Sequence, residues 1–303
     1  MLNRKIRGNK PRKFNLSNHP WISLAALWVT GIFVLIITAA GANKLGVPGN
    51  SPFRPLVTPT LAHIIVLFLI VPFVFQLPNG KSNYRNFLKA IRLIPIKPFL
   101  LLLILGITSS FVFLFLLSLN SIILRATQGF PINLTFLKYF IDLRHDLPPR
   151  SLSWVAAFPS IFEEVSWRGV MLVLFMKKYS ARKSILITAL GFGLFHLINL
   201  LGGVDLNFVI LQVIMGSAVG FFYGYLVLRT NSLLPAMLFH FLVNMFIGSF
   251  TFYFQRYTSD GTKILYALVS YPIAVLVLIV LTKAFCKKWI SEPEYFPSFD
   301  ISS

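Results

Sequence analysis

Three ionisable side chains stand within six residues of an otherwise apolar stretch of the sequence. Glu163 and Glu164 are adjacent, and Arg168 follows them in the same run. The uncharged residues around them make residues 151–176 long enough to cross a membrane, where each charge costs at least about 2.5–3.5 kcal/mol. Ionisable residues at such depth indicate a functional site, whereas the alternative is an interfacial loop that carries a solvated ion pair.

Helix geometry gives the two carboxylates different neighbours. Glu164 and Arg168 are spaced i,i+4, so their side chains share a helix face and can form an ion pair. Glu163 is turned about 100° away around the helix and has no such partner. We therefore predict that Glu164 neutralises Arg168 and that Glu163 is available as a base.

Two histidines lie well inside other apolar runs. At about 1.5 Å per residue, His196, His240 and Glu163 all fall in the middle third of a hydrocarbon core about 30 Å thick. Phe192 precedes His196 by one helical turn, and the two side chains share a face. Asn244 follows His240 in the same relation. The predicted site therefore contains a carboxylate, two imidazoles and an amide.

The other histidines and the single cysteine carry no predicted chemistry. His19 and His145 lie in polar segments, where they are expected to be solvated. His63 lies near the outer end of an apolar run, where an interfacial histidine is unremarkable. Cys286 has no base nearby in the sequence, and a cysteine nucleophile needs one.

The predicted group of side chains suits the hydrolysis of an acyl bond. Glu163 and His196 could hold and deprotonate a water molecule. His240 and Asn244 could donate hydrogen bonds to the oxyanion that forms. Alternatively, Glu163, His196 and His240 make a Zn²⁺ ligand set with a fourth position open for water. The HExxH spacing of many zinc sites is absent, so these residues leave both mechanisms open.

Membrane-spanning helices must position these residues. Of the 303 residues, 56% are hydrophobic and only 12% are charged, against about 25% charged residues in a soluble domain. The apolar residues gather in runs of about 20, the length that crosses a bilayer. We predict an all-α, polytopic membrane helical bundle with about eight transmembrane helices, at residues 21–43, 57–76, 98–124, 151–176, 184–201, 206–228, 231–253 and 264–282.

Basic residues predict the orientation of this bundle. With the N-terminus inside, the cytoplasmic segments hold nineteen Lys and Arg residues and the outer loops hold eight. This asymmetry follows the positive-inside rule, so we expect both termini in the cytoplasm. We also expect the protein in the plasma membrane of a prokaryote. The net charge of +19 suits contact with anionic membrane lipids, and we expect no nucleic-acid partner.

Three motifs, in order on three predicted helices, resemble those of one protein family. They are EExxxR in Glu163-Glu164-Val-Ser-Trp-Arg168, FxxxH in Phe192-Gly-Leu-Phe-His196, and HxxxN/D in His240-Phe-Leu-Val-Asn244. Together they resemble the CAAX prenyl endopeptidase, Abi and bacteriocin-processing (CPBP) family of intramembrane proteases. The resemblance covers about residues 150–250. Between the last two motifs, Gly216, Gly220 and Gly224 predict a close helix–helix contact.

The resemblance implies a CAAX-type intramembrane endopeptidase that acts on a peptide or a lipidated protein, near its C-terminus or at a leader peptide. By resemblance, Glu163 and His196 activate water. His240 and Asn244 stabilise the oxyanion, and the remaining charged residues of EExxxR support the site. Members of the family are often described as metalloproteases, yet a metal-free glutamate mechanism is also proposed for them. We favour the metal-free mechanism and keep Zn²⁺ as the alternative.

The resemblance, together with the apolar and basic runs, divides the chain into four parts. These are a basic cytoplasmic tail (residues 1–20), three N-terminal transmembrane helices with their loops (21–149), a CPBP-like catalytic core (150–255), and a last transmembrane helix with a cytoplasmic tail (256–303). A non-catalytic membrane immunity or scaffolding protein, or a small transporter, is the alternative function. A scaffold needs none of the predicted catalytic residues, and a transporter usually shows paired halves. The sequence therefore favours the peptidase.

Overall fold

In a computed structural model of the protein, the described residues are 15–49, 51, 53–54, 56–78, 83–127, 129, 157–256 and 260–290. Every regular element within these ranges is helical, which confirms the predicted all-α fold. The N-terminal elements are η1 (Leu16–Asn18), α1 (Pro20–Lys44), η2 (Leu56–Thr60), α2 (Leu61–Ile65), η3 (Val66–Phe75), α3 (Tyr84–Ala90) and α4 (Phe99–Thr127). The C-terminal elements are α7 (Pro159–Glu164), η5 (Val165–Met171), α8 (Leu172–Met176), α9 (Ala181–Phe195), η6 (His196–Gly202), α10 (Leu206–Thr230), α11 (Leu234–Arg256) and α12 (Asp260–Trp289).

Six helices in this part of the chain are long and apolar enough to cross a membrane. They are Pro20–Lys44, Val57–Phe75, Phe99–Leu124, Ala181–Leu201, Leu206–Thr230 and Gly261–Trp289. The other two predicted spans are also helical, because α7, η5 and α8 follow one another directly and α11 runs from Leu234 to Arg256. The predicted tails before residue 15 and after residue 290, and residues 151–156 of the fourth predicted span, lie outside the described residues.

Large apolar side chains cover the outer surface of the bundle. Phe33 on α1, Phe115 on α4 and Leu276 on α12 are each more than 60% exposed. A water-soluble protein seldom exposes so much apolar surface, whereas lipid tails solvate it well. The bundle is therefore an integral membrane protein.

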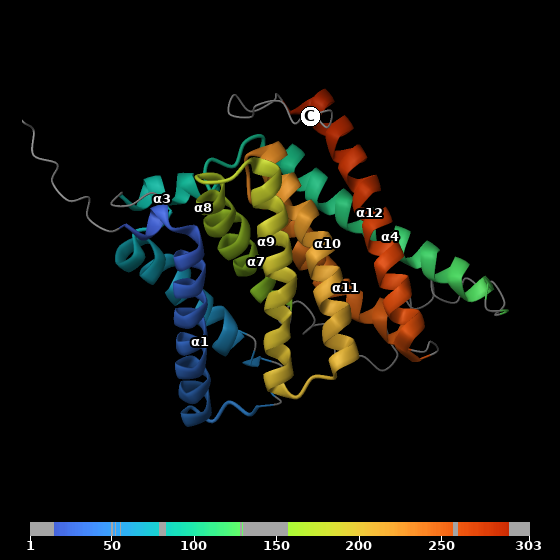
Figure 1. Cartoon of the computed structure of the whole chain (residues 1–303), viewed down its shortest axis with the longest axis horizontal. Helices are drawn as coiled ribbons and strands as arrows, with labels where there is room; N and C mark the ends of the chain where they lie inside the picture. Colours follow the sequence, from blue (N-terminus) through green and yellow to red (C-terminus); the bar gives the residue numbers. More distant parts are fainter. Residues whose placement is uncertain are drawn as a thin grey trace, which may run out of the picture.

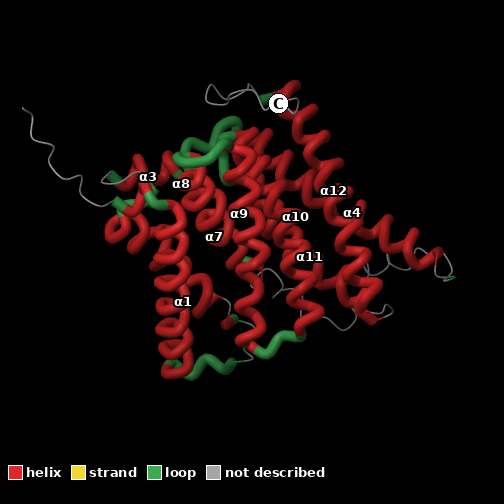
Figure 2. The backbone as a smooth tube through the Cα atoms, in the orientation of Figure 1, coloured by secondary structure: helices red, strands yellow, loops and turns green. Residues whose placement is uncertain are grey.

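Helices α10 and α11 lie in the middle of the bundle. Helix α10 packs against α9 and α12, while α11 packs against α4 and α7. In Figure 1, α1 lies at one edge and α12 and α4 lie at the other. Figure 2 shows that helices make up nearly all of the described chain and that short loops join them. This arrangement places α7 and η5, which carry the three charged residues of the first motif, inside the bundle.

The glycines of α10 allow α9 to approach closely. A Cβ atom added at Gly216 would lie 3.2 Å from the Cα atom of Gly193 on α9. One added at Gly224 would lie 3.1 Å from a side-chain carbon of Ile185. The predicted close helix–helix contact is therefore confirmed, and it brings the second motif, at the end of α9, against α10.

Candidate active site

The ion pair expected from the i,i+4 spacing is present in the first motif. Nη1 of Arg168 lies 3.0 Å from Oε1 of Glu164, and both side chains are fully buried. Arg168 belongs to η5, a π-helical segment that begins directly after Glu164. Such segments inside longer helices are often found at functional sites.

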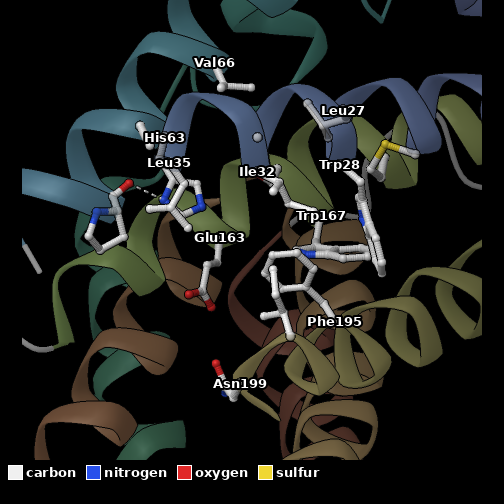
Figure 3. A pocket seen from close by; sticks show the side chains of 16 residues that line it. Leu27, Trp28, Ile32, Leu35, His63, Val66, Glu163, Trp167, Phe195 and Asn199 are labelled. Carbon is white, nitrogen blue, oxygen red and sulfur yellow. Dashed lines mark hydrogen bonds between the residues drawn. The ribbon is translucent and has the colours of Figure 1, made fainter. Parts of the chain in front are cut away.

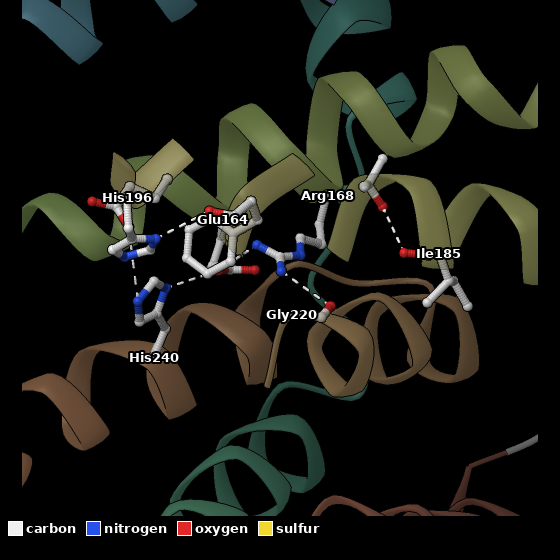
Figure 4. A network of polar contacts seen from close by, with 9 residues as sticks. Glu164, Arg168, Ile185, His196, Gly220 and His240 are labelled. Atoms are coloured by element: carbon white, nitrogen blue, oxygen red, sulfur yellow. Dashed lines mark hydrogen bonds and ion pairs between the residues drawn. The ribbon is translucent and has the colours of Figure 1, made fainter. Parts of the chain in front are cut away.

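Buried groups from α9 and α10 surround the guanidinium of Arg168. Its Nη2 donates a hydrogen bond to the carbonyl oxygen of Gly220 at 3.0 Å (Figure 4). Its Cζ lies 4.5 Å from the ring centroid of Phe192 and 4.9 Å from that of Tyr223. A Cβ atom at Gly220 would lie 2.8 Å from Nη2. The glycine is therefore needed so that the arginine can reach this carbonyl.

His240 is held by the same carboxylate as Arg168. Its Nδ1 lies 2.8 Å from Oε1 of Glu164 (Figure 4). A carboxylate only accepts, so Nδ1 carries the proton, and the position of the ring is fixed. The ring also stacks on Tyr223, with centroids 4.9 Å apart. Glu164 therefore orients His240 as well as neutralising Arg168, a second role that the sequence did not reveal.

Glu163 is placed quite differently from its neighbour. Its side chain is 25% exposed, and its Oε2 lies 3.8 Å from Nε2 of His240. It lines a cavity of about 230 Å³, whereas Glu164 does not (Figure 3). One carboxylate is thus fixed in a buried network, while the other reaches the cavity.

His196 begins η6, at the point where α9 ends. Its Nδ1 lies 3.1 Å from the carbonyl oxygen of Phe192, which leaves Nε2 as an acceptor. The ring of Phe192 meets both imidazoles edge-on, with centroids 5.2 Å from that of His196 and 5.6 Å from that of His240. In Figure 4 the two imidazoles face each other. Asn244 lies one turn beyond His240 on α11.

The cavity has an apolar side and a polar side. Trp28 of α1 packs edge-on against Trp167 and Phe195, with ring centroids 6.2 and 5.1 Å apart, and all three residues line the cavity. Figure 3 shows these rings on one side of the cavity and His63, Glu163 and Asn199 on the other. The chain thus places a carboxylate beside a space large enough for an apolar group.

The sequence alone did not indicate the positions of three residues at the site, His63, Asn199 and Tyr223. His63 is not an isolated interfacial histidine, because the helix that carries it packs against α7 and brings it to the cavity wall. Asn199 also lines the cavity, and Tyr223 contacts both Arg168 and His240. A polar residue in an apolar helix was the only available signal for His63 and Asn199.

The zinc alternative requires Glu163, His196 and His240 to converge on one point. Within the described ranges, no group of three His, Cys, Asp or Glu side chains is placed to hold a metal ion. His240 is bonded through Nδ1 to Glu164, and His196 is bonded through Nδ1 to a carbonyl oxygen. Both bonds leave Nε2 of each ring available, as in histidines that bind metals, so the zinc alternative stays a prediction.

Comparison with known proteins found a match, and it covers the segment that contains the three motifs. A family model described as Rce1-like, type II CAAX prenyl endopeptidase, matches residues 147–246. No curated protein and no solved structure matches the chain. The matched segment holds all three motifs, and it excludes α1 and α2, which line the cavity. Over residues 147–246, about a third of the chain, the sequence is therefore similar to the Rce1-like family of type II CAAX prenyl endopeptidases.

Proposed function

We propose that the protein is an intramembrane endopeptidase that cleaves peptide bonds of lipidated proteins at the membrane, with Glu163 as general base. The observation that carries the proposal is the unequal placement of the two carboxylates. Glu164 is buried in an ion pair, while Glu163 is partly exposed in a cavity within the bundle. We further propose that both termini lie in the cytoplasm, as the basic residues indicate.

The proposed reaction begins with a water molecule beside Glu163. The carboxylate removes a proton from this water as its oxygen attacks the carbonyl carbon of the substrate, and His196 helps to hold the water. The carbonyl oxygen becomes an oxyanion, which accepts hydrogen bonds from His240 and Asn244. Protonated Glu163 then gives its proton to the leaving amine as the C–N bond breaks.

The role of His240 sets a condition on its protonation. Its Nδ1 proton is already donated to Glu164, so a donor at Nε2 requires the doubly protonated ring. In that form the ring lies between two carboxylates, with Glu163 on the Nε2 side at 3.8 Å. The proposed mechanism therefore requires the doubly protonated form of His240 to stabilise the negative charge that develops at the oxyanion.

The cavity supports a lipidated substrate. Trp28, Ile32 and Phe195 give it a wall suited to an isoprenoid chain, while Glu163 lies at its polar side. The test uses two synthetic peptides that end in cysteine, two aliphatic residues and a serine, the C-a-a-X pattern of prenylated proteins. One peptide carries an S-farnesyl group and the other does not. We expect the purified protein to release the last three residues from the farnesylated peptide; cleavage of neither peptide would contradict the proposal.

Filling the cavity from α1 should block the lipidated substrate without unfolding the protein. Gly31 lines the cavity, and a Cβ atom added there has no neighbour within 4 Å. We expect Gly31→Leu to lower kcat/KM for the farnesylated peptide by about 10-fold or more, without lowering the melting temperature.

Gly41→Leu is the matched control for this change. Gly41 lies on the same helix and also has open space around its Cβ position, but it does not line the cavity. Both replacements raise helix propensity by a similar amount. Equal kcat/KM values for the two variants would show that the cavity does not receive the substrate.

Removal of metal should leave the activity intact. Among the described residues no group of three His, Cys, Asp or Glu side chains is placed to hold a metal ion, and the proposed mechanism gives the proton transfer to Glu163 itself. We expect protein treated with a chelator and shown to be metal-free by elemental analysis to cleave the farnesylated peptide at least half as fast as untreated protein. Loss of activity that added Zn²⁺ restores would instead support the metal mechanism.

A further inference from the structure

His63 lies in the cavity wall beside the proposed base. It belongs to α2, and its ring stacks on that of Phe162 with centroids 6.3 Å apart and an angle of 15° between the planes. Phe162 immediately precedes Glu163 in α7. His63 and Glu163 both line the cavity, and Figure 3 shows them on the same side of it.

A hydrogen bond within the helix fixes the tautomer of His63. Its Nδ1 lies 2.7 Å from the carbonyl oxygen of Pro59, one turn earlier. A carbonyl oxygen can only accept, so the proton resides on Nδ1 and Nε2 of the neutral ring is an acceptor. No described residue donates a hydrogen bond to this Nε2 atom. The ring therefore presents a fixed and unused acceptor in the cavity wall.

Asn199 adds a second acceptor to the same side of the cavity. Its Nδ2 donates to Oε1 of Gln212 at 2.9 Å, which leaves Oδ1 for a ligand. The Glu163 carboxylate is a third acceptor. A ligand bound against these three groups must therefore supply hydrogen-bond donors. A peptide backbone has them in its N–H groups.

We propose that His63 is a substrate-binding residue whose Nε2 accepts a hydrogen bond from a backbone N–H of the peptide being cleaved. The inference rests on the proposed endopeptidase function and adds to it a contact from outside residues 147–246. Substrate recognition would then depend on α2 as well as on the helices that carry the three motifs. This hydrogen bond should stabilise the bound substrate and the transition state equally, because His63 takes no part in the proton transfers.

Three variants separate this role from a purely structural one. His63→Phe keeps an aromatic ring on Phe162 and removes both nitrogens, so we expect KM to rise about 10-fold while kcat stays within about 2-fold. His63→Gln places an amide oxygen near the position of Nε2 and should restore most of the affinity. Ile64→Phe is the control, because Ile64 is the next residue of α2, is 40% exposed and does not line the cavity.

The binding experiment uses the Glu163→Gln form, so that affinity is measured without turnover. The probe is the farnesylated C-a-a-X peptide together with versions N-methylated at one backbone amide at a time. In the protein with His63 intact, we expect N-methylation of one particular amide to weaken binding about 10-fold. After His63→Phe, that same N-methylation should have no further effect, as a double-mutant cycle requires for two groups in contact.

The outcomes distinguish this inference from the proposed function. If the wild-type protein cleaves the peptide but His63→Phe binds and cleaves it normally, the inference about His63 is wrong and the endopeptidase proposal stands. The inference is also wrong if each N-methylation weakens binding equally with His63 intact and after His63→Phe. It is likewise wrong if His63→Phe lowers kcat and leaves KM unchanged. If the wild-type protein neither binds nor cleaves the peptide, both proposals are wrong.

Discussion

Replacing Glu163 with glutamine is expected to lower turnover by about 100-fold or more, the range for loss of a general base. The protein should nevertheless fold normally. Glu163 is partly exposed, its nearest ionisable partner is His240 at 3.8 Å, and the ion pair of Glu164 with Arg168 is left intact by the substitution. Glutamine keeps the shape of the side chain and removes only the basic oxygen. Cleavage rate and melting temperature are to be measured on the same purified sample.

Ser166→Ala provides the control for this experiment. Ser166 also lines the cavity and is also polar, but it has no role in the proposed proton transfers. We expect it to change turnover by less than about 5-fold, the size of a modest hydrogen-bond effect. A folded Glu163→Gln protein with nearly normal turnover would show that another group is the base, with Glu164 or a metal-bound water as the remaining candidates.

Replacing Glu164 with glutamine should have a second large effect, this time on stability as well as on activity. Its Oε1 accepts from Nη1 of Arg168 and from Nδ1 of His240, and all three side chains are buried. Removal of one partner of a buried ion pair typically costs about 3–5 kcal/mol, because the other charge is left alone. We expect Glu164→Gln to melt well below the wild-type protein and to be inactive, whereas Glu163→Gln melts normally.

A double variant tests the reason for this loss. Glu164→Gln combined with Arg168→Met removes both charges, and replacement of a whole buried pair by uncharged groups is often neutral for stability. We expect the double variant to recover most of the melting temperature while it remains inactive, because His240 has lost the carboxylate that orients it. A Glu164→Gln protein that melts like the wild type would show that the ion pair does not stabilise the fold.

The features that the sequence predicted well are those that depend on helix geometry alone. The apolar runs located the helices, because crossing a bilayer requires about 20 uncharged residues whatever the neighbouring helices are. The spacing of Glu164 and Arg168 gave their ion pair, and the four-residue spacing of the glycines on α10 gave the contact with α9. Each of these patterns lies within one helix.

The features that were missed depend on which helices pack together. His240 and Glu164 are 76 residues apart in the chain, so their hydrogen bond follows only from the packing of α11 against α7. The cavity likewise requires α1 and α2 to pack beside α7, and without it His63 cannot be told from an ordinary interfacial histidine. The π-helical segments could not be predicted from the spacing of the apolar residues either.

The site is divided between two parts of the chain, and this division affects how its cavity can evolve. The buried network of Glu164, Arg168 and His240 comes from helices of the matched segment, whereas α1 and α2 supply many of the residues that line the cavity. Glu163 connects the two, because it lines the cavity and its Oε2 lies 3.8 Å from Nε2 of His240. Substitutions in α1 can therefore reshape the cavity without touching an atom of the ion pair. Under the proposed function, mutation and selection could then vary the accepted substrate while the chemistry is retained.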